Sequence, residues 1–231
     1  MFAFDENPAS CGRHIALSNN NLTARKSGSS YESIIANTSF RHGQHYWEMR
    51  IDHYREPEDI WIGVCRKPLD VNSNSPPLSG NFWSLLCSHG SRCLTSRESG
   101  YYHPITADGD RVGVLLDTEN GTLSYFHNDQ FIGEAFHDLP RNTDLFPAVN
   151  LYYETVQVTL VFPRRPPSRA AGSANWGGLD AEMEQERAQH READRELAKR
   201  AEDKLRQEAA GSASASSEEE KKGQVIKMVV E

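Results

Sequence analysis

Residues 1–162 of this 231-residue chain predict an all-β domain, a two-sheet antiparallel β-sandwich. Short runs of β-branched and aromatic residues alternate there with turn clusters, at the roughly 8–12-residue spacing that is typical of sandwiches and barrels. No helix-length amphipathic pattern interrupts the series. Of the 21 aromatic residues, 20 lie at or before Phe162, so the side chains needed for a core are concentrated in this part.

The individual strands are predicted from composition and alternation. In the run 155–162 (TVQVTLVF), apolar Val156, Val158 and Leu160 alternate with polar side chains, which is the period-two pattern of a half-buried strand. The same kind of composition predicts further strands at 14–18, 45–52, 60–65, 82–87 and 145–151.

Residues 111–136 predict a three-stranded meander. Asn120-Gly121 lies between two strand-like runs, and this pair favours a two-residue type I′ turn. A second reversal is predicted at 127–130, where His-Asn-Asp-Gln separates the next two runs.

The composition changes abruptly near Pro163, where the predicted domain ends. Residues 163–178 are Pro-rich and then Gly/Ser-rich, which predicts a flexible linker. Residues 179–209 lack Gly and Pro and carry opposite charges one turn apart, so we expect a single charged, solvated helix. Its one short apolar stripe falls short of the repeated heptads of a coiled coil. Residues 210–231 are of low complexity and predict a disordered tail.

The charge balance and the cysteines limit the class of protein. The chain has 25 basic and 33 acidic residues, and this net charge of −8 argues against nucleic acid as the main partner. No apolar run approaches the roughly 20 residues that span a bilayer, and the first ten residues do not resemble a signal peptide. Four cysteines without a secretory signal indicate reduced thiols, so we expect a cytoplasmic protein, with the nucleus as the alternative.

Four runs in consistent order carry a family resemblance: GQHYWEMRID (43–52), IWIGVCR (60–66), GDRVGVLLDTENGTLSYFHND (109–129) and LFPAVNLYYETVQVTLVF (145–162). Together they resemble a SPRY domain, and the most specific signatures are Trp47-Glu48 and Leu116-Asp117. The start of the chain, at 4–25, is similar to the lead-in of the SPRY domains of tripartite-motif ubiquitin ligases. The resemblance covers about 5–162.

The resemblance implies a protein-interaction module. Such a module binds a peptide or protein surface through loops at one end of the sandwich and brings a substrate to a larger assembly, such as a ubiquitin ligase. The 231 residues contain no RING, B-box or F-box pattern, so a ubiquitin-related role would require a second chain. We expect the domain to be monomeric.

The sequence contains no pattern that predicts catalysis or metal binding. Cys87-Ser88-His89 followed by Cys93 comes nearest, but structural zinc usually takes four ligands, two of them at CxxC-like spacing. There is no Gly-x-Ser-x-Gly, no phosphate-binding Gly-rich loop and no His-Glu-x-x-His. We therefore expect no enzymatic activity, no metal and no cofactor.

Polar loops supply the candidate binding surface. Binding residues concentrate in loops held by a rigid scaffold, and interface anchors are enriched in Tyr, Trp and Arg. The segments 24–33, 53–59, 88–104 and 151–155 fit this description, and by the resemblance the first and last face peptide ligands in SPRY domains. The predicted partner-binding residues are Arg25, Lys26, Tyr31, Tyr54, Arg55, Arg92, Arg97, Tyr101, Tyr102, Tyr152 and Tyr153.

Gathering of the basic residues at one end would favour an acidic peptide, by steering and by charge-assisted hydrogen bonds. In the competing interpretation, one tyrosine of each adjacent pair packs inward and the arginines are only solvated.

Two other functions stay open. One is lectin-like sugar or metal binding, for which Trp83 beside Asn81 is the local hint, although we expect Trp83 to face the core. The other is a structural subunit docked through the helix at 179–209.

Overall fold

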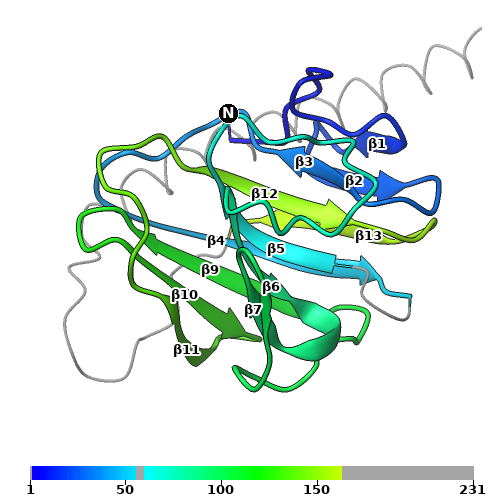
Figure 1. The fold of residues 1–231 in the computed structure, drawn as a ribbon. Coiled ribbons are helices and arrows are strands. Elements are labelled where there is room, and N and C mark those ends of the chain that lie inside the picture. The colour runs from blue at the N-terminus through cyan, green and yellow to red at the C-terminus, as the bar shows by residue number, and fades with distance from the viewer. Residues whose placement is uncertain (1, 56–59, 163–231) are drawn as a thin grey trace, which may run out of the picture. The chain divides into compact units, whose positions relative to one another are not determined.

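The computed structural model describes residues 2–55 and 60–162, and their regular structure is almost entirely β-strand (Figure 1). The predicted linker, helix and tail, at 163–178, 179–209 and 210–231, lie outside the described residues. The strands are β1 (Ile15–Ser18), β2 (Thr23–Lys26), β3 (Glu32–Ile35), β4 (Gln44–His53), β5 (Ile60–Cys65), β6 (Phe82–Leu86), β7 (Ser91–Cys93), β8 (Arg97–Glu98), β9 (Arg111–Asp117), β10 (Thr122–His127), β11 (Gln130–Phe136), β12 (Phe146–Leu151) and β13 (Gln157–Val161), with a 3-10 turn, η1 (Cys87–His89), after β6.

The strands form two antiparallel sheets, as the sequence predicts. One sheet has seven strands in the order β1-β2-β13-β4-β9-β10-β11, and the other has six in the order β3-β12-β5-β6-β7-β8. The predicted meander is β9-β10-β11. The short strands β2, β3, β7 and β8 are not among those predicted from the sequence. In the described part of the chain, no helix is long and apolar enough to cross a membrane.

The first turn of the meander differs from the prediction, whereas the second lies at 127–130, where it was predicted. Asp117 pairs with Thr122, so the first turn contains four residues, and of these only Gly121 has a positive φ. The carboxylate of Asp117 accepts the backbone N–H groups of Glu119 and Asn120 and holds this longer turn, so the two-residue type I′ prediction at Asn120-Gly121 is wrong.

The second turn has the geometry that was expected for the first. Asn128 and Asp129 both have positive φ, and the flanking residues His127 and Gln130 pair with each other. This is the two-residue hairpin in which both central residues must be left-handed.

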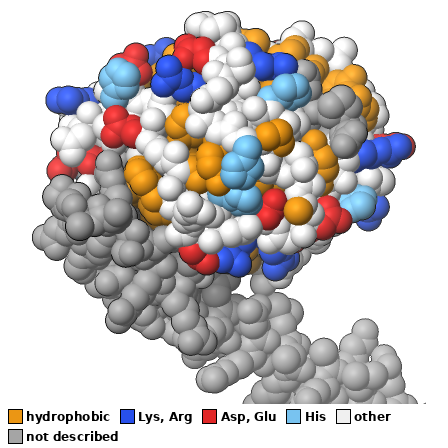
Figure 2. All heavy atoms as spheres, turned by 90° about the horizontal axis from the view of Figure 1, so that it is seen from below, with side chains coloured by type: hydrophobic (Ala, Val, Ile, Leu, Met, Phe, Trp, Pro, Cys, Tyr) orange, Lys and Arg blue, Asp and Glu red, His pale blue; other side chains and the backbone are white. Residues whose placement is uncertain are grey.

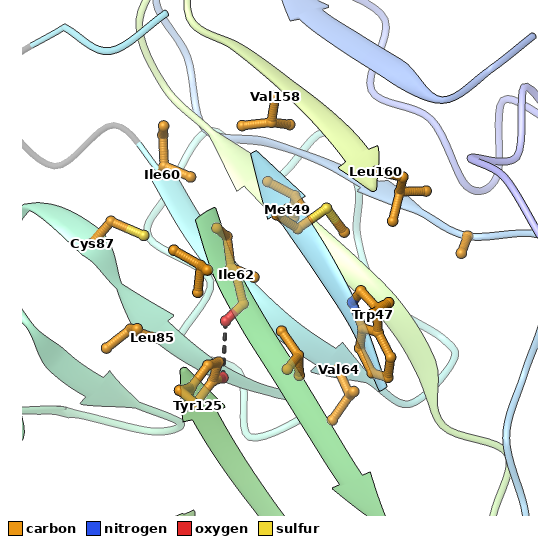
Figure 3. Close-up of a cluster of buried hydrophobic side chains, with 14 of the residues drawn as sticks. Trp47, Met49, Ile60, Ile62, Val64, Leu85, Cys87, Tyr125, Val158 and Leu160 are labelled. Atoms are coloured by element: carbon orange, nitrogen blue, oxygen red, sulfur yellow. Dashed lines mark hydrogen bonds between the residues drawn. The ribbon is translucent and has the colours of Figure 1, made fainter. Parts of the chain in front are cut away.

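The core lies between the sheets (Figure 3). Trp47 and Met49 of β4 and Leu160 of β13 face Ile62 of β5, and all of these side chains are almost fully buried. The Tyr125 hydroxyl of β10 donates a hydrogen bond to the Ile62 carbonyl at 2.9 Å and so joins the two sheets through the core.

Strand β5 is buried on both faces. Ile62 and Val64 face the inter-sheet core, while Trp61 and Cys65 belong to a second cluster on the outer side of the six-stranded sheet. The segment between β5 and β6 contributes Val71 to that cluster. A strand with two covered faces reads as a continuous apolar run, as IWIGVC does.

Strand register brings the candidate loops to one end of the sandwich. Leu151 at the end of β12 pairs with Glu32 at the start of β3 and with Ile60 at the start of β5. In the other sheet, Gln157 at the start of β13 pairs with His53 at the end of β4. The segments 27–31, 54–55, 103–110 and 152–156 therefore share one end, at the right of Figure 1, which we call the loop end.

Gly63 is required where β5 and β6 come into close contact. A Cβ at this position would overlap the Trp83 carbonyl oxygen and lie 2.8 Å from the Ser84 Cα. We expect Gly63→Ala to lower the free energy of unfolding by about 1–3 kcal/mol or more, as overpacking does. Urea titration followed by tryptophan fluorescence measures the change.

Gly28→Ala is the matched control, because its Cβ would meet only the His14 ring at 3.7 Å, an ordinary contact. It should change the stability by less than about 1 kcal/mol. Equal effects of the two substitutions would contradict the argument from close packing.

Candidate binding surface at the loop end

A pair of tyrosines with their rings in contact is the central feature of the loop end. Tyr31 precedes β3 and Tyr152 follows β12, its neighbour, and their ring centroids are 4.4 Å apart. The Tyr153 ring packs edge-on to Tyr152 at 4.5 Å. The Ser30 N–H donates to the Tyr152 carbonyl at 3.0 Å. Paired strands thus hold three half-buried aromatic rings in fixed positions.

Tyr54 and Arg55 lie beside these tyrosines. Arg55 forms an ion pair with Glu154 at 3.7 Å, and both side chains are more than half exposed, so the pair contributes little to stability. Tyr54 packs partly against the core, and its N–H donates to Asp108 at 2.7 Å. This hydrogen bond, with a second from His53, lowers the pKa of the Asp108 carboxyl.

Lys26 is not exposed, which corrects its assignment as a contact residue. Its side chain is fully buried, its ammonium donates to the Gly28 carbonyl at 2.7 Å and the Ser30 hydroxyl at 3.2 Å, and it pairs with Glu32 at 3.5 Å. Burial lowers the pKa of Lys26, while the charge of Glu32 opposes that shift. Lys26 therefore acts within the fold, as the partner of a buried carboxylate.

Glu32 is the buried carboxylate beneath the loop 27–31. Burial favours its neutral form, but hydrogen bonds from the His14 ring and N–H, the charge of Lys26 and a hydrogen bond from Ser30 outweigh this and lower its pKa. The Glu32–His14 ring contact measures 2.6 Å.

Only some of the predicted arginines lie near the loop end. Arg55 belongs to it, and Arg25 is exposed on β2 beside it, since Arg25 pairs with Gln157. Arg92 and Arg97 lie on β7 and β8, at the far edge of the six-stranded sheet. Figure 2 likewise shows basic side chains scattered over one face of the domain. The expected polarisation of charge is therefore wrong, because strand order separates residues that sequence composition groups together.

Arg92 and Tyr101 join the two sheets at that far edge. Arg92 donates to the Ala135 carbonyl at 3.0 Å and pairs with Glu98 at 2.7 Å, while the Tyr101 hydroxyl donates to the Gly133 carbonyl at 2.6 Å. Both carbonyls belong to the edge strand β11. Tyr101 packs inward, while Tyr102 is partly exposed beside His103, with ring centroids 3.7 Å apart.

A polar pocket adjoins the tyrosine pair. It has a volume of about 520 Å³ and is lined by Arg13, His14, Gly28, Ser29, Ser30, Glu32, Asn72 and Asn74. The Asn74 N–H donates to the Tyr31 carbonyl at 3.2 Å, and Ser30 and Glu32, on either side of Tyr31, line the pocket. Sequence reasoning missed Arg13, His14, Asn72 and Asn74, because no local pattern relates segments that only the folded chain brings together.

The patterns considered for metal and sugar binding lie elsewhere. Cys87 and Cys93 are buried, and among the described residues no three or more His, Cys, Asp or Glu side chains are placed to hold a metal ion. Trp83 faces the core, as predicted, and is 5% exposed, so it does not offer a platform for a sugar.

A protein-family model described as the SPRY domain matches residues 44–165, more than half of the chain. The chain belongs to the SPRY family. SPRY domains bind protein partners and are generally non-catalytic modules. The predicted resemblance is therefore confirmed at the level of the family.

The curated relatives include F-box/SPRY domain-containing protein 1 of Drosophila persimilis, which is 27% identical over 69% of this chain and 66% of the relative. The Anopheles gambiae protein of the same name is 24% identical, with the same coverage. The chain thus spans 66% of the length of these relatives.

Two solved structures have the same fold. The SPRY domain of human HERC1 superposes with a TM-score of 0.60 at 20% identity, covering 68% of this chain and 96% of that domain. The TRIM65 PSpry domain superposes with a TM-score of 0.56, also at 20% identity, covering 70% of this chain and 90% of that one. At this identity the likeness shows the fold alone.

Glu32→Gln should reduce the loss of stability in acid. Because folding lowers the pKa of Glu32 below its usual 4.5, the unfolded chain takes up this proton first. The contribution of Glu32 to stability is therefore present above about pH 4.5 and is lost as the pH falls through the folded pKa. We expect a deficit of about 3–5 kcal/mol near neutral pH, since Lys26 loses its partner, and convergence with the wild type in acid.

Urea titrations at several pH values between neutrality and about pH 3 measure this difference. Asp144→Asn is the control, because Asp144 also has a lowered pKa but its partner, Arg41, is about half exposed. Its effect should be much smaller. A deficit in Glu32→Gln that does not change with pH would contradict the prediction.

Proposed function

We propose that this chain is a non-catalytic adaptor that binds a peptide or protein surface through the loop end. The observation that carries the proposal is the contact between the tilted rings of Tyr31 and Tyr152, with Tyr153 packed against Tyr152, beside paired strands that hold all three rings in place. Membership of the SPRY family supports the class of partner, a protein.

The physical properties of this surface suit recognition. Tyrosine offers a large amphipathic contact area with few rotatable bonds, so little conformational entropy is lost on binding. The exposed Arg55–Glu154 pair, next to Tyr54 and Tyr153 in the chain, supplies polar groups beside this aromatic surface. The acidic composition of the chain argues for a protein rather than a nucleic acid.

We also propose that the bound protein is presented to a ubiquitin ligase. The support is the likeness to proteins named F-box/SPRY domain-containing protein 1. Such a role would place the chain in the cytoplasm or nucleus. A protein captured by this chain should lose ubiquitin conjugates when the chain is depleted from cells, and unchanged conjugates would contradict this part of the proposal.

Capture from cell extract tests the binding surface. The immobilised full chain is compared with a variant carrying Tyr31→Ala and Tyr152→Ala, and bound proteins are quantified by mass spectrometry. Truncation of two anchor tyrosines should cost about 2 kcal/mol or more and reduce capture of specific partners at least about tenfold.

A double variant with Glu119→Ala and His137→Ala serves as the control, because both side chains are exposed at the opposite end of the sandwich. Its capture should match the wild type. All variants are first shown to melt alike. Equal capture by the tyrosine variant and the wild type would place the binding surface elsewhere.

A further inference from the structure

We propose that the polar pocket beside Tyr31 binds the side-chain carboxylate of an acidic residue in the partner. This inference rests on the proposed function, since the pocket opens next to the tyrosine pair of the same surface. The pocket combines three segments of the chain: residues 13–14 before β1, residues 28–32 between β2 and β3, and residues 72–74 between β5 and β6.

The carboxylate in the pocket wall is already satisfied. Glu32 accepts hydrogen bonds from the His14 ring at 2.6 Å, the His14 N–H at 2.8 Å and the Ser30 hydroxyl at 3.1 Å. Buried Lys26 pairs with it at 3.5 Å and balances its charge. Glu32 therefore neither repels an incoming anion as an unpaired charge would, nor has an oxygen left for a basic ligand.

The charge that remains in the lining is positive. Arg13 is exposed, and the lining contains no acidic residue besides Glu32. The His14 ring is about half exposed, and its Nδ1 donates to Glu32, so in the imidazolium form its Nε2–H is the donor left for a carboxylate. A carboxylate is the group that an arginine binds best, because the planar guanidinium can donate two parallel hydrogen bonds to it.

The polar neighbours of Arg13 also present donors. The Asn72 side-chain oxygen accepts the Arg13 N–H at 2.9 Å and its Nε–H at 3.4 Å. Its oxygen is therefore occupied, and the NH₂ end of the amide, a donor, is left for a ligand. Ser29 adds an exposed hydroxyl. Apart from Gly28, every residue of the lining has a side chain with a polar group.

A glycine allows this arrangement to form. A Cβ at Gly12 would lie 2.6 Å from the Glu32 Cβ, so only glycine lets the segment that carries Arg13 and His14 approach Glu32 this closely. The backbone that carries Arg13 and His14 is therefore held in place before a ligand arrives, which reduces the entropy lost on binding.

The probes that test the inference are nonapeptide libraries with a fixed central residue, acetylated and amidated so that the ends carry no charge. Separate libraries fix Glu, Gln, Asp, Asn or Lys, and binding to the full chain is measured by fluorescence polarisation. We expect the Glu and Asp libraries to bind about tenfold more tightly than their amide counterparts. Arg13→Gln should abolish this preference, and His14→Gln should weaken it.

Arg66→Gln is the matched control, since it removes an exposed arginine after β5 that is not part of the pocket lining. It should leave the acidic preference unchanged. Loss of the preference in Arg66→Gln as well as in Arg13→Gln would mean that overall charge is responsible, which would overturn the pocket assignment. A Gln library with a free C-terminus that binds as well as the Glu library would show recognition of a chain terminus and would also overturn it.

Failure of this inference can be told apart from failure of the proposed function. Equal binding of the Glu and Gln libraries, lost in the Tyr31→Ala, Tyr152→Ala variant, would overturn the carboxylate assignment and leave the binding surface in place. The same holds if no library binds but capture of proteins from extract still depends on the two tyrosines. Binding and capture that are both independent of the tyrosines would overturn both proposals.

Discussion

The buried ion pair between Lys26 and Glu32 is the interaction on which the loop end depends. Lys26 ends β2 in the seven-stranded sheet and Glu32 begins β3 in the six-stranded sheet, so the pair joins the two layers. An ammonium and a carboxylate removed from water are tolerated only when each is paired and hydrogen-bonded, and loss of one partner leaves an uncompensated charge. The connection between the sheets is therefore held in one conformation.

The short connection 27–31 takes its shape from that pair. The Lys26 ammonium binds the Gly28 carbonyl and the Ser30 hydroxyl. Tyr31 is the last residue of this connection and directly precedes Glu32. The Tyr31 ring can contact the Tyr152 ring because β3 and β12 are neighbouring strands. The same carboxylate holds His14 at the edge of the polar pocket. One buried charge pair thus positions both the aromatic and the polar parts of the binding surface.

Hydrophobic alternation and apolar runs in the sequence predicted the strands well where the pattern lies within a single strand. The alternation in 155–162 and the apolar run IWIGVC became β13 and β5. The type of the first turn was predicted wrongly, because a turn depends on the strand pairs that flank it as well as on its central residues. Asn120-Gly121 has the favoured composition, but Asp117 accepts two backbone N–H groups and stabilises a four-residue turn.

The sequence by itself determined the fold class, the family and the tyrosines of the loop end, because periodicity, turn composition and motif order are properties of the chain. Tertiary structure alone decided the role of each predicted residue. It buried Lys26, turned Arg92 and Tyr101 toward β11 at the far edge, and brought Arg13 and Asn72 into one pocket. The physical reason is that burial and pairing depend on strand order and register, which connect residues many positions apart and leave no local pattern.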